Sequence, residues 1–127
     1  MQVKIPVSVG ELFDKVTILI IKHGKLKKQE EKDIVYKELS LLEKKLAKID
    51  PLYLKSQFFK RLKNVNLDLW NIEEGKRQCE ALKTFDGHFV MLAREVYINN
   101  DLRAKIKKAI NKKYNSDIVE IKSYKKY

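Results

Sequence analysis

The spacing of apolar residues predicts a chain built mainly from long amphipathic helices. Residues 2–7 read as an extended lead-in, after which Ser8 and Glu11 form a capping box for a first helix. This helix is expected to run to about residues 23–24, and a second is expected over residues 25–49. The apolar positions of the second helix recur at i, i+4, i+7, i+11 and i+14, as in a helical hairpin or short coiled coil. They are Val35, Leu39, Leu42, Leu46 and Ile49.

A second apolar seam predicts a long third helix over residues 52–82. Its positions are Phe58, Leu62, Val65, Leu69 and Ile72. Asp86 is a suitable N-cap for a fourth helix over residues 87–114. Residues 118–124 alternate in polarity, so they could pair with residues 4–7 as a short terminal β-ribbon. The predicted fold is therefore all-α, an antiparallel bundle of long helices with a helical hairpin.

Composition agrees with a single helical domain over residues 1–127. Four Gly and two Pro leave little turn chemistry for a many-stranded sheet. The hydrophobic fraction of 44% can build a core, and the charged fraction of 35% exceeds the roughly 25% of an average protein. The exposed seams and the long hairpin also lead us to expect a homodimer.

The net charge of +11 is concentrated toward the end of the chain. Residues 103–127 hold nine basic and two acidic residues, a net charge of +7. Such a region can serve solubility, or it can bind nucleic acid by contacting backbone phosphates and stacking aromatic rings on bases. The side chains for the second alternative are Arg103, Lys105, Lys107, Lys108, Lys112, Lys113, Lys122, Lys125 and Lys126, with Tyr114, Tyr124 and Tyr127. No recognition motif accompanies them.

Cellular location is predicted from what the sequence lacks. Cys79 is the only cysteine, which excludes an intramolecular disulfide and favours a reducing compartment. Residues 1–10 show no signal-peptide pattern, and the longest apolar run, residues 16–21, is too short to cross a bilayer. We therefore expect a cytoplasmic protein with no membrane partner.

The most informative pattern is a stripe of mixed polar chemistry on the third helix. Asn66, Trp70, Glu73 and Arg77 lie at i, i+4, i+7 and i+11, so they share one helical face. An amide, an indole, a carboxylate and a guanidinium together suit a half-buried polar cluster. The same spacing recurs on the first and last helices. Those stripes are Glu11, Lys15, Ile18 and Lys22, and Tyr97, Asp101, Ala104 and Lys108.

These stripes predict either a ligand site or a set of structural salt bridges. The first helix is apolar around most of its circumference, so its charges need partners, for which Arg77 and Asp101 are the natural candidates. If the stripes line a cleft, cationic and aromatic groups there would suit a small anionic or nucleotide-like ligand. The candidate ligand-binding residues are Glu11, Asp14, Lys15, Lys22, Asn66, Trp70, Glu73, Arg77, Tyr97 and Asp101. In the structural alternative the stripes only fix helix register, and the chain is an oligomerisation or interaction module.

No motif identifies a reaction, a cofactor or a metal. Helical nucleoside-triphosphate pyrophosphatases carry Glu-Glu-x-x-Glu, whereas Glu73–Glu74 is followed by Arg77. His23 and His88 have no second strong ligand at helical spacing, so no metal site is expected. No nucleophile–base pair is identifiable by spacing, and the cofactor and any enzymatic activity stay open.

Four segments together resemble a small family of bacterial and phage proteins of unknown function. They are Val-Ser-Val-Gly-Glu-Leu-Phe-Asp-Lys-Val-Thr-Ile-Leu at residues 7–19, Val-Asn-Leu-Asp-Leu-Trp-Asn-Ile-Glu at residues 65–73, residues 93–104, and Ile-Val-Glu-Ile-Lys-Ser-Tyr at residues 118–124. The resemblance implies a phage or marine bacterial origin. It covers nearly the whole chain and transfers no activity, although its pattern emphasises the polar positions singled out above.

Overall fold

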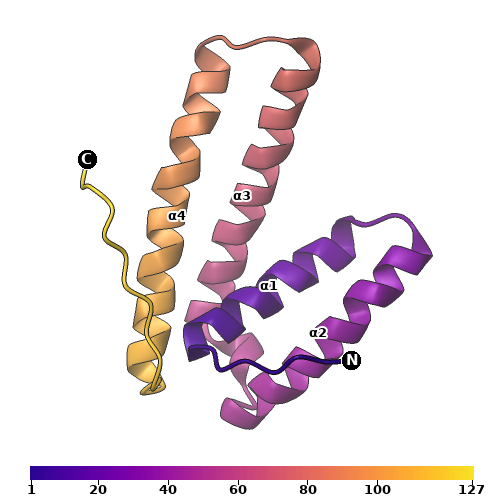
Figure 1. The fold of residues 1–127 in the computed structure, drawn as a ribbon, viewed down its shortest axis with the longest axis vertical. Helices are drawn as coiled ribbons and strands as arrows, with labels where there is room; N and C mark the ends of the chain where they lie inside the picture. Colours follow the sequence, from indigo (N-terminus) through magenta and orange to yellow (C-terminus); the bar gives the residue numbers. More distant parts are fainter.

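The protein consists of four α-helices and one short 3-10 turn (Figure 1). The computed structural model describes residues 1–127. The elements are α1 (Val9–Lys25), α2 (Gln29–Ile49), the 3-10 turn η1 (Tyr53–Lys55), α3 (Gln57–Leu82) and α4 (Gly87–Lys113). The all-α prediction is confirmed, because no strand is present.

Side-chain caps fix where the helices begin. The Ser8 hydroxyl accepts a hydrogen bond from the Glu11 amide at 3.0 Å, as the capping-box prediction required. The Asp86 carboxylate likewise accepts from the amides at the start of α4. The third helix was predicted from residue 52 but begins at Gln57, because Ser56 is extended and caps it while η1 occupies the preceding residues. At its end, Lys83 adopts a left-handed conformation with φ of 54°, which stops α3.

The helices form two hairpins, and α1 is the element that joins them. Figure 1 shows the α1–α2 hairpin lying obliquely across the lower part of the longer α3–α4 hairpin, and α1 packs against α2, α3 and α4. The main core is a cluster of 11 buried residues drawn from all four helices and η1. Its fully buried side chains include Phe13, Val16, Leu46, Leu62 and Ile110. We call this region, where α1 and α2 cover α3 and α4, the base.

The predicted seam of the second helix is used inside the chain. Leu39 and Leu46 are buried, and Val35 and Leu42 are half-buried in the same core, whereas Ile49 is exposed. The seam therefore packs on α1 rather than standing free. The homodimer stays a prediction, but this seam no longer supports it because it packs within the chain.

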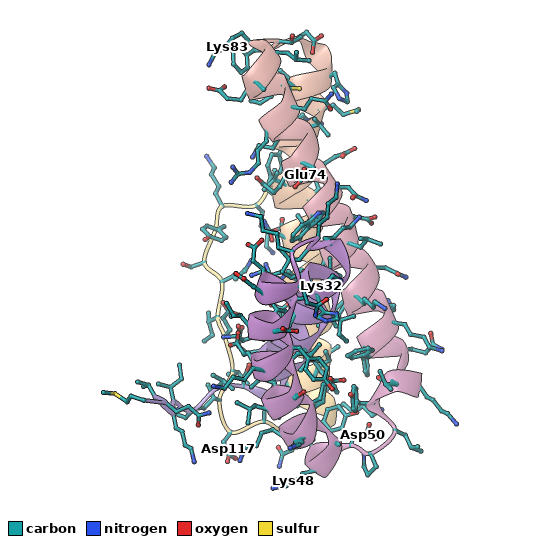
Figure 2. All side chains as sticks on the ribbon, turned by 90° about the vertical axis from the view of Figure 1, so that its right-hand side faces the viewer. Lys32, Lys48, Asp50, Glu74, Lys83 and Asp117 are labelled. Atoms are coloured by element: carbon teal, nitrogen blue, oxygen red, sulfur yellow. The ribbon has the colours of Figure 1, made fainter.

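Beyond the base, α3 and α4 continue as a two-helix projection that we call the arm, residues 72–96. In Figure 2 the arm rises past the end of the α1–α2 hairpin near Glu74 and reaches its tip near Lys83. Its core contains only three buried residues, Ile72, Cys79 and Leu92.

The predicted terminal β-ribbon is wrong. Residues 1–8 are extended and point away from the body (Figure 2), whereas residues 117–127 run back along α4 (Figure 1). The two segments diverge from a common root, where the Val9 amide donates to the Ser116 hydroxyl at 3.1 Å. The alternation in both segments is thus not used for pairing.

A membrane-spanning helix needs both sufficient length and sufficient hydrophobicity, and none of the four helices meets both requirements.

Candidate functional site

A buried carboxylate, Asp14 on α1, organises the contact between α1, α3 and α4. Asp14 is 0% exposed, and its carboxylate accepts three hydrogen bonds from two side chains. Asn66 Nδ2 on α3 donates to Asp14 Oδ1 at 2.8 Å. Arg103 on α4 donates from Nε to Oδ1 at 2.9 Å and from Nη2 to Oδ2. This two-point geometry is the strong form of a guanidinium–carboxylate pair.

Asn66 is held in a fixed orientation by a second partner on α1. The Asn66 amide also donates to the Thr17 hydroxyl at 2.8 Å, and that hydroxyl donates to the Asp14 carbonyl oxygen at 2.7 Å. Thr17 is fully buried. The stripe on the third helix thus contacts the first helix through Asn66, at Asp14 and Thr17.

Lys107, one turn after Arg103, forms a second ion-pair centre. Its Nζ lies 2.7 Å from Glu11 Oε2, 3.7 Å from Asp14 Oδ2 and 3.1 Å from Glu120 Oε2. Burial lowers the pKa of Lys107, but the bonds to Glu11 and Glu120 and the charge of Asp14 outweigh it, so the net shift is upward. The bond to Asp14 raises the pKa of Arg103 in the same way. Both side chains are therefore held as cations.

Close backbone contact places these groups in register. The Gly10 amide donates to Asn111 Oδ1 at 2.7 Å. A Cβ at Gly10 would lie 2.6 Å from the Lys107 carbonyl oxygen, so a larger residue would push α1 away from α4. Glycine at this position lets α1 approach near enough for its carboxylates to reach Arg103 and Lys107.

Next to this network lies an open pocket of about 380 Å³. It is bounded by α1, α3 and α4 at the level where the arm leaves the base, close to Glu74 in Figure 2. Its lining residues are Ile18, Ile21, Asn66, Leu69, Trp70, Glu73, Glu74, Arg77 and Arg103. The pocket therefore combines an aliphatic wall, a half-buried indole, two guanidinium groups and two carboxylates.

The two guanidinium groups are in different states. Arg103 uses three of its N–H groups on Asp14 and Asn100, which leaves two of its five N–H groups without a partner. Arg77 is exposed and forms no ion pair. Of the carboxylates, Glu73 lies 3.3 Å from the Lys76 ammonium, outside the pocket lining.

Four of the sequence-predicted site residues lie elsewhere. Lys15 points to α2 and pairs with Glu38 at 3.0 Å. Lys22 is half-buried and does not line the pocket. Tyr97 and Asp101 lie on a different face of α4, beside the C-terminal segment.

That second location is a separate hollow of about 350 Å³ between α4 and the tail. The Tyr97 and Tyr127 rings meet edge to face with centroids 5.1 Å apart. A hydrogen bond to Asp101 raises the pKa of the Tyr127 hydroxyl. The last-helix stripe therefore does not join the other two in one cleft.

The expected partners of the first-helix charges were also wrong. Arg77 and Asp101 were the candidates, whereas Arg103 and Lys107 pair with the carboxylates of α1 and Glu38 pairs with Lys15. Their signal was present in the sequence, because Arg103, Lys107 and Asn111 lie at i, i+4 and i+8 on one helical face. Both cations had been assigned to the basic C-terminal set, and their burial against carboxylates removes them from any free basic surface.

The fold and the pocket define an all-α protein of two crossed helical hairpins with a polar pocket between them. Over residues 1–127 the chain matches a family described as "Family of unknown function (DUF6165)", so the protein belongs to that family. This confirms the resemblance to a family without an assigned activity, while its bacterial and phage range stays a prediction. No curated protein and no solved structure matches the chain.

Proposed function

We propose that the protein binds a small anionic, nucleotide-like ligand in the pocket beside Trp70. The observation that carries this proposal is the unpaired guanidinium of Arg77 in the same pocket as the half-buried indole of Trp70 and the oriented guanidinium of Arg103. An indole offers a face for a planar ring, and a guanidinium pairs with phosphate or carboxylate oxygens through two parallel bonds.

The carboxylates of the pocket favour a ligand that is more than a bare anion. Glu73 and Glu74 can accept hydrogen bonds from hydroxyl or amino groups but would repel an isolated phosphate. A nucleotide carries both an anionic end and several such donors. The proposed orientation places the phosphate at Arg77 and Arg103, the ring against Trp70, and donor groups toward the two glutamates.

The network behind the pocket supports binding by pre-organising its polar wall. Asp14 fixes both Asn66 and Arg103 from the buried side. A side chain already held in one rotamer loses little entropy when a ligand binds. In the competing interpretation the same network only fixes helix register, and the pocket has no ligand.

Trp70 allows a direct test, since it is the only tryptophan in the chain. Titration of the full chain with adenosine monophosphate should change its fluorescence, with inorganic phosphate giving a weaker response. Arg77→Ala should weaken binding by at least about tenfold, because a charged hydrogen bond contributes about 1.5–3 kcal/mol. Because Arg77 is exposed and unpaired, its removal should change stability by no more than about 0.5 kcal/mol.

Arg94→Ala is the matched control, since Arg94 is likewise an exposed arginine of the arm without an ion pair but does not line the pocket. It should leave binding unchanged. No response to nucleotide at millimolar concentration would refute the proposal, as would equal losses in the two variants.

A further inference from the structure

The whole net charge of the protein is located in two segments. Residues 44–63 and 105–113 contain twelve Lys and Arg residues and one acidic residue, which gives them the full +11 of the chain. The other 98 residues balance at sixteen basic and sixteen acidic. A surplus confined in this way creates a strong local potential rather than a diffuse one.

The fold brings these two segments together at one end of the molecule. They form the last turns of α2, η1, the first turns of α3 and the end of α4. The Tyr114 hydroxyl donates to Asp50, which ties the end of α4 to the end of α2, and Lys113 Nζ lies 5.6 Å from the centre of the Phe58 ring on α3. In Figure 2 Lys48 and Asp50 lie at the end opposite the arm tip. We call this surface the basic end.

The charge of the basic end is available to a partner. Of its twelve basic side chains only Lys107 is buried and ion-paired, whereas the other eleven are exposed and form no ion pair. The single carboxylate of its two segments, Asp50, already accepts from the Tyr114 hydroxyl and the Leu52 amide, and the neighbouring Glu43 accepts from the Tyr53 hydroxyl. The acidic side chains nearest to this end, such as Glu43, form no ion pair with these eleven cations.

Aliphatic side chains project from the middle of the same surface. Ile49, Leu52 and Leu54 are 43%, 64% and 58% exposed in the connection between α2 and α3. Exposed lysines at positions 48 and 55 flank them. The aromatic residues of this connection point the other way, since Tyr53 is buried and Phe58 is half-buried against the core.

This combination favours a lipid surface over nucleic acid. Exposed leucines gain nothing from a phosphate backbone, and this end has no exposed aromatic ring to stack on unpaired bases. An anionic bilayer offers phosphates to the lysines and an apolar layer just beneath them to the leucines. The sequence predicted no membrane partner because it lacks a spanning apolar run, a criterion that does not apply to peripheral binding.

We propose that the basic end docks on the surface of an anionic phospholipid bilayer. The lysines contact the headgroup phosphates, and Leu52 and Leu54 enter the boundary between headgroups and acyl chains. Binding is peripheral and reversible, as is usual when no lipid anchor or spanning helix takes part. The proposal is independent of the ligand pocket, which lies at the opposite side of the base, beside the arm.

Co-sedimentation of the full chain with vesicles tests this proposal. The protein should bind vesicles of phosphatidylcholine mixed with phosphatidylglycerol and not vesicles of phosphatidylcholine alone, and added salt should weaken binding. The triple substitution Lys45→Gln, Lys48→Gln and Lys55→Gln should reduce affinity by about a hundredfold. Leu52→Ser with Leu54→Ser should reduce it by at least about tenfold, with net charge unchanged.

Matched variants separate the surface from the overall charge and hydrophobicity. Lys25→Gln, Lys27→Gln and Lys28→Gln remove the same charge from exposed positions between α1 and α2. Ile34→Ser with Leu82→Ser removes equally exposed aliphatic groups outside the basic end. Both controls should bind vesicles within about twofold of the parent protein. Circular dichroism of each variant confirms that the helices are intact.

Two outcomes would overturn the proposal. One is equal loss of vesicle binding in the lysine variant and its control, which would indicate a net-charge effect. The other is a leucine variant that keeps full vesicle binding while the lysine variant loses tight binding to duplex DNA, which would assign the basic end to nucleic acid.

Discussion

The base and the arm share α3 and α4, yet the polar groups of the two regions have opposite environments. In the base, α1 covers α3 and α4 and buries Asp14 completely among Asn66, Arg103 and Lys107. In the arm, charged residues stay at the surface, as in the pair between Lys83 and Glu80 at 3.2 Å. Only three apolar residues are buried there, against eleven in the main core.

The difference shows what a third layer adds to a helical hairpin. Two helices alone have one shared apolar strip and cannot enclose an ion, since each side chain still reaches water. A third helix crossing them creates an interior where an ion must be paired. The candidate pocket lies where the crossing helix ends, so it has buried groups on one side and solvent on the other.

The largest effect should come from removing the buried carboxylate of the base. Asp14→Ala leaves Arg103 and Lys107 without their central partner, and we expect a loss of about 3–5 kcal/mol in the free energy of unfolding. Glu80→Ala, which breaks the exposed pair of the arm, should cost less than about 0.5 kcal/mol. Urea denaturation of the two variants measures both values. Similar costs would show that the base does not depend on its ionic centre.

The two apolar cores should also differ in sensitivity. Leu62 is 0% exposed in the main core and Leu92 is 8% exposed in the arm. Leu62→Ala should cost about 3–5 kcal/mol and Leu92→Ala about 2 kcal/mol, because a cavity in the arm can collapse or fill with water. Amide hydrogen exchange provides a second measurement, with faster exchange expected along the arm than in α1. Uniform protection would contradict the division into base and arm.

Glycine substitutions test how rigid the two helix contacts are. A Cβ at Gly10 would meet the Lys107 carbonyl oxygen, whereas a Cβ at Gly75 would lie 3.0 Å from a methyl group of Leu92. A backbone oxygen cannot give way, so we expect Gly10→Ala to cost about 1–3 kcal/mol. A leucine side chain can shift, and the better helix propensity of alanine offsets that shift, so Gly75→Ala should be neutral within about 1 kcal/mol. Thermal denaturation of both variants is sufficient, and a milder effect at Gly10 than at Gly75 would refute this account.

The smallest expected effect concerns two tyrosines of the base. Burial, followed by hydrogen bonds to Glu43 and Asp50, raises the pKa values of Tyr53 and Tyr114 from 10.0 to about 12. Their neutral forms therefore stabilise the fold fully below pH 10, and that contribution is lost as the pH rises from 10 to about 12.

Denaturant unfolding at a series of alkaline pH values measures this loss. Tyr53→Phe with Tyr114→Phe should make the pH dependence shallower in the same interval. Tyr36→Phe serves as the control, since Tyr36 is exposed. If the free energy of unfolding falls with pH equally in the double variant and in the control, the two hydroxyl hydrogen bonds do not contribute to stability.

Local sequence signals predicted the helices well, and pairing across helices much less well. The capping residues Ser8 and Asp86 and the apolar seams placed the helices to within a few residues. The partners of Asp14 could not be obtained in that way, because Arg103 lies 89 residues away and competes with many other cations in a basic chain. Alternation at both termini suggested a ribbon, but local periodicity carries no information on whether a partner strand is in reach.

The same limit applies to the candidate site. Asn66, Trp70, Glu73 and Arg77 were identified as a single face of one helix, and all four line the pocket. Tyr97 and Asp101 share the same spacing but face the tail, because the rotation of α4 about its axis is set by Arg103 and Lys107. Equal spacing on two helices does not make their stripes meet.

The bonds from the start of α1 to the end of α4 have a topological consequence. Val9 and Gly10 are hydrogen-bonded to Ser116 and Asn111, so the helical part of the chain nearly closes into a ring. In a ring the position of the chain ends is arbitrary, and a short linker between residues 116 and 8 would let the polypeptide be reopened at the exposed tip over residues 83–86. In such a circularly permuted chain α1 would follow α4 directly, and the hydrogen bonds between them, which span 107 and 101 residues in the native order, would become local.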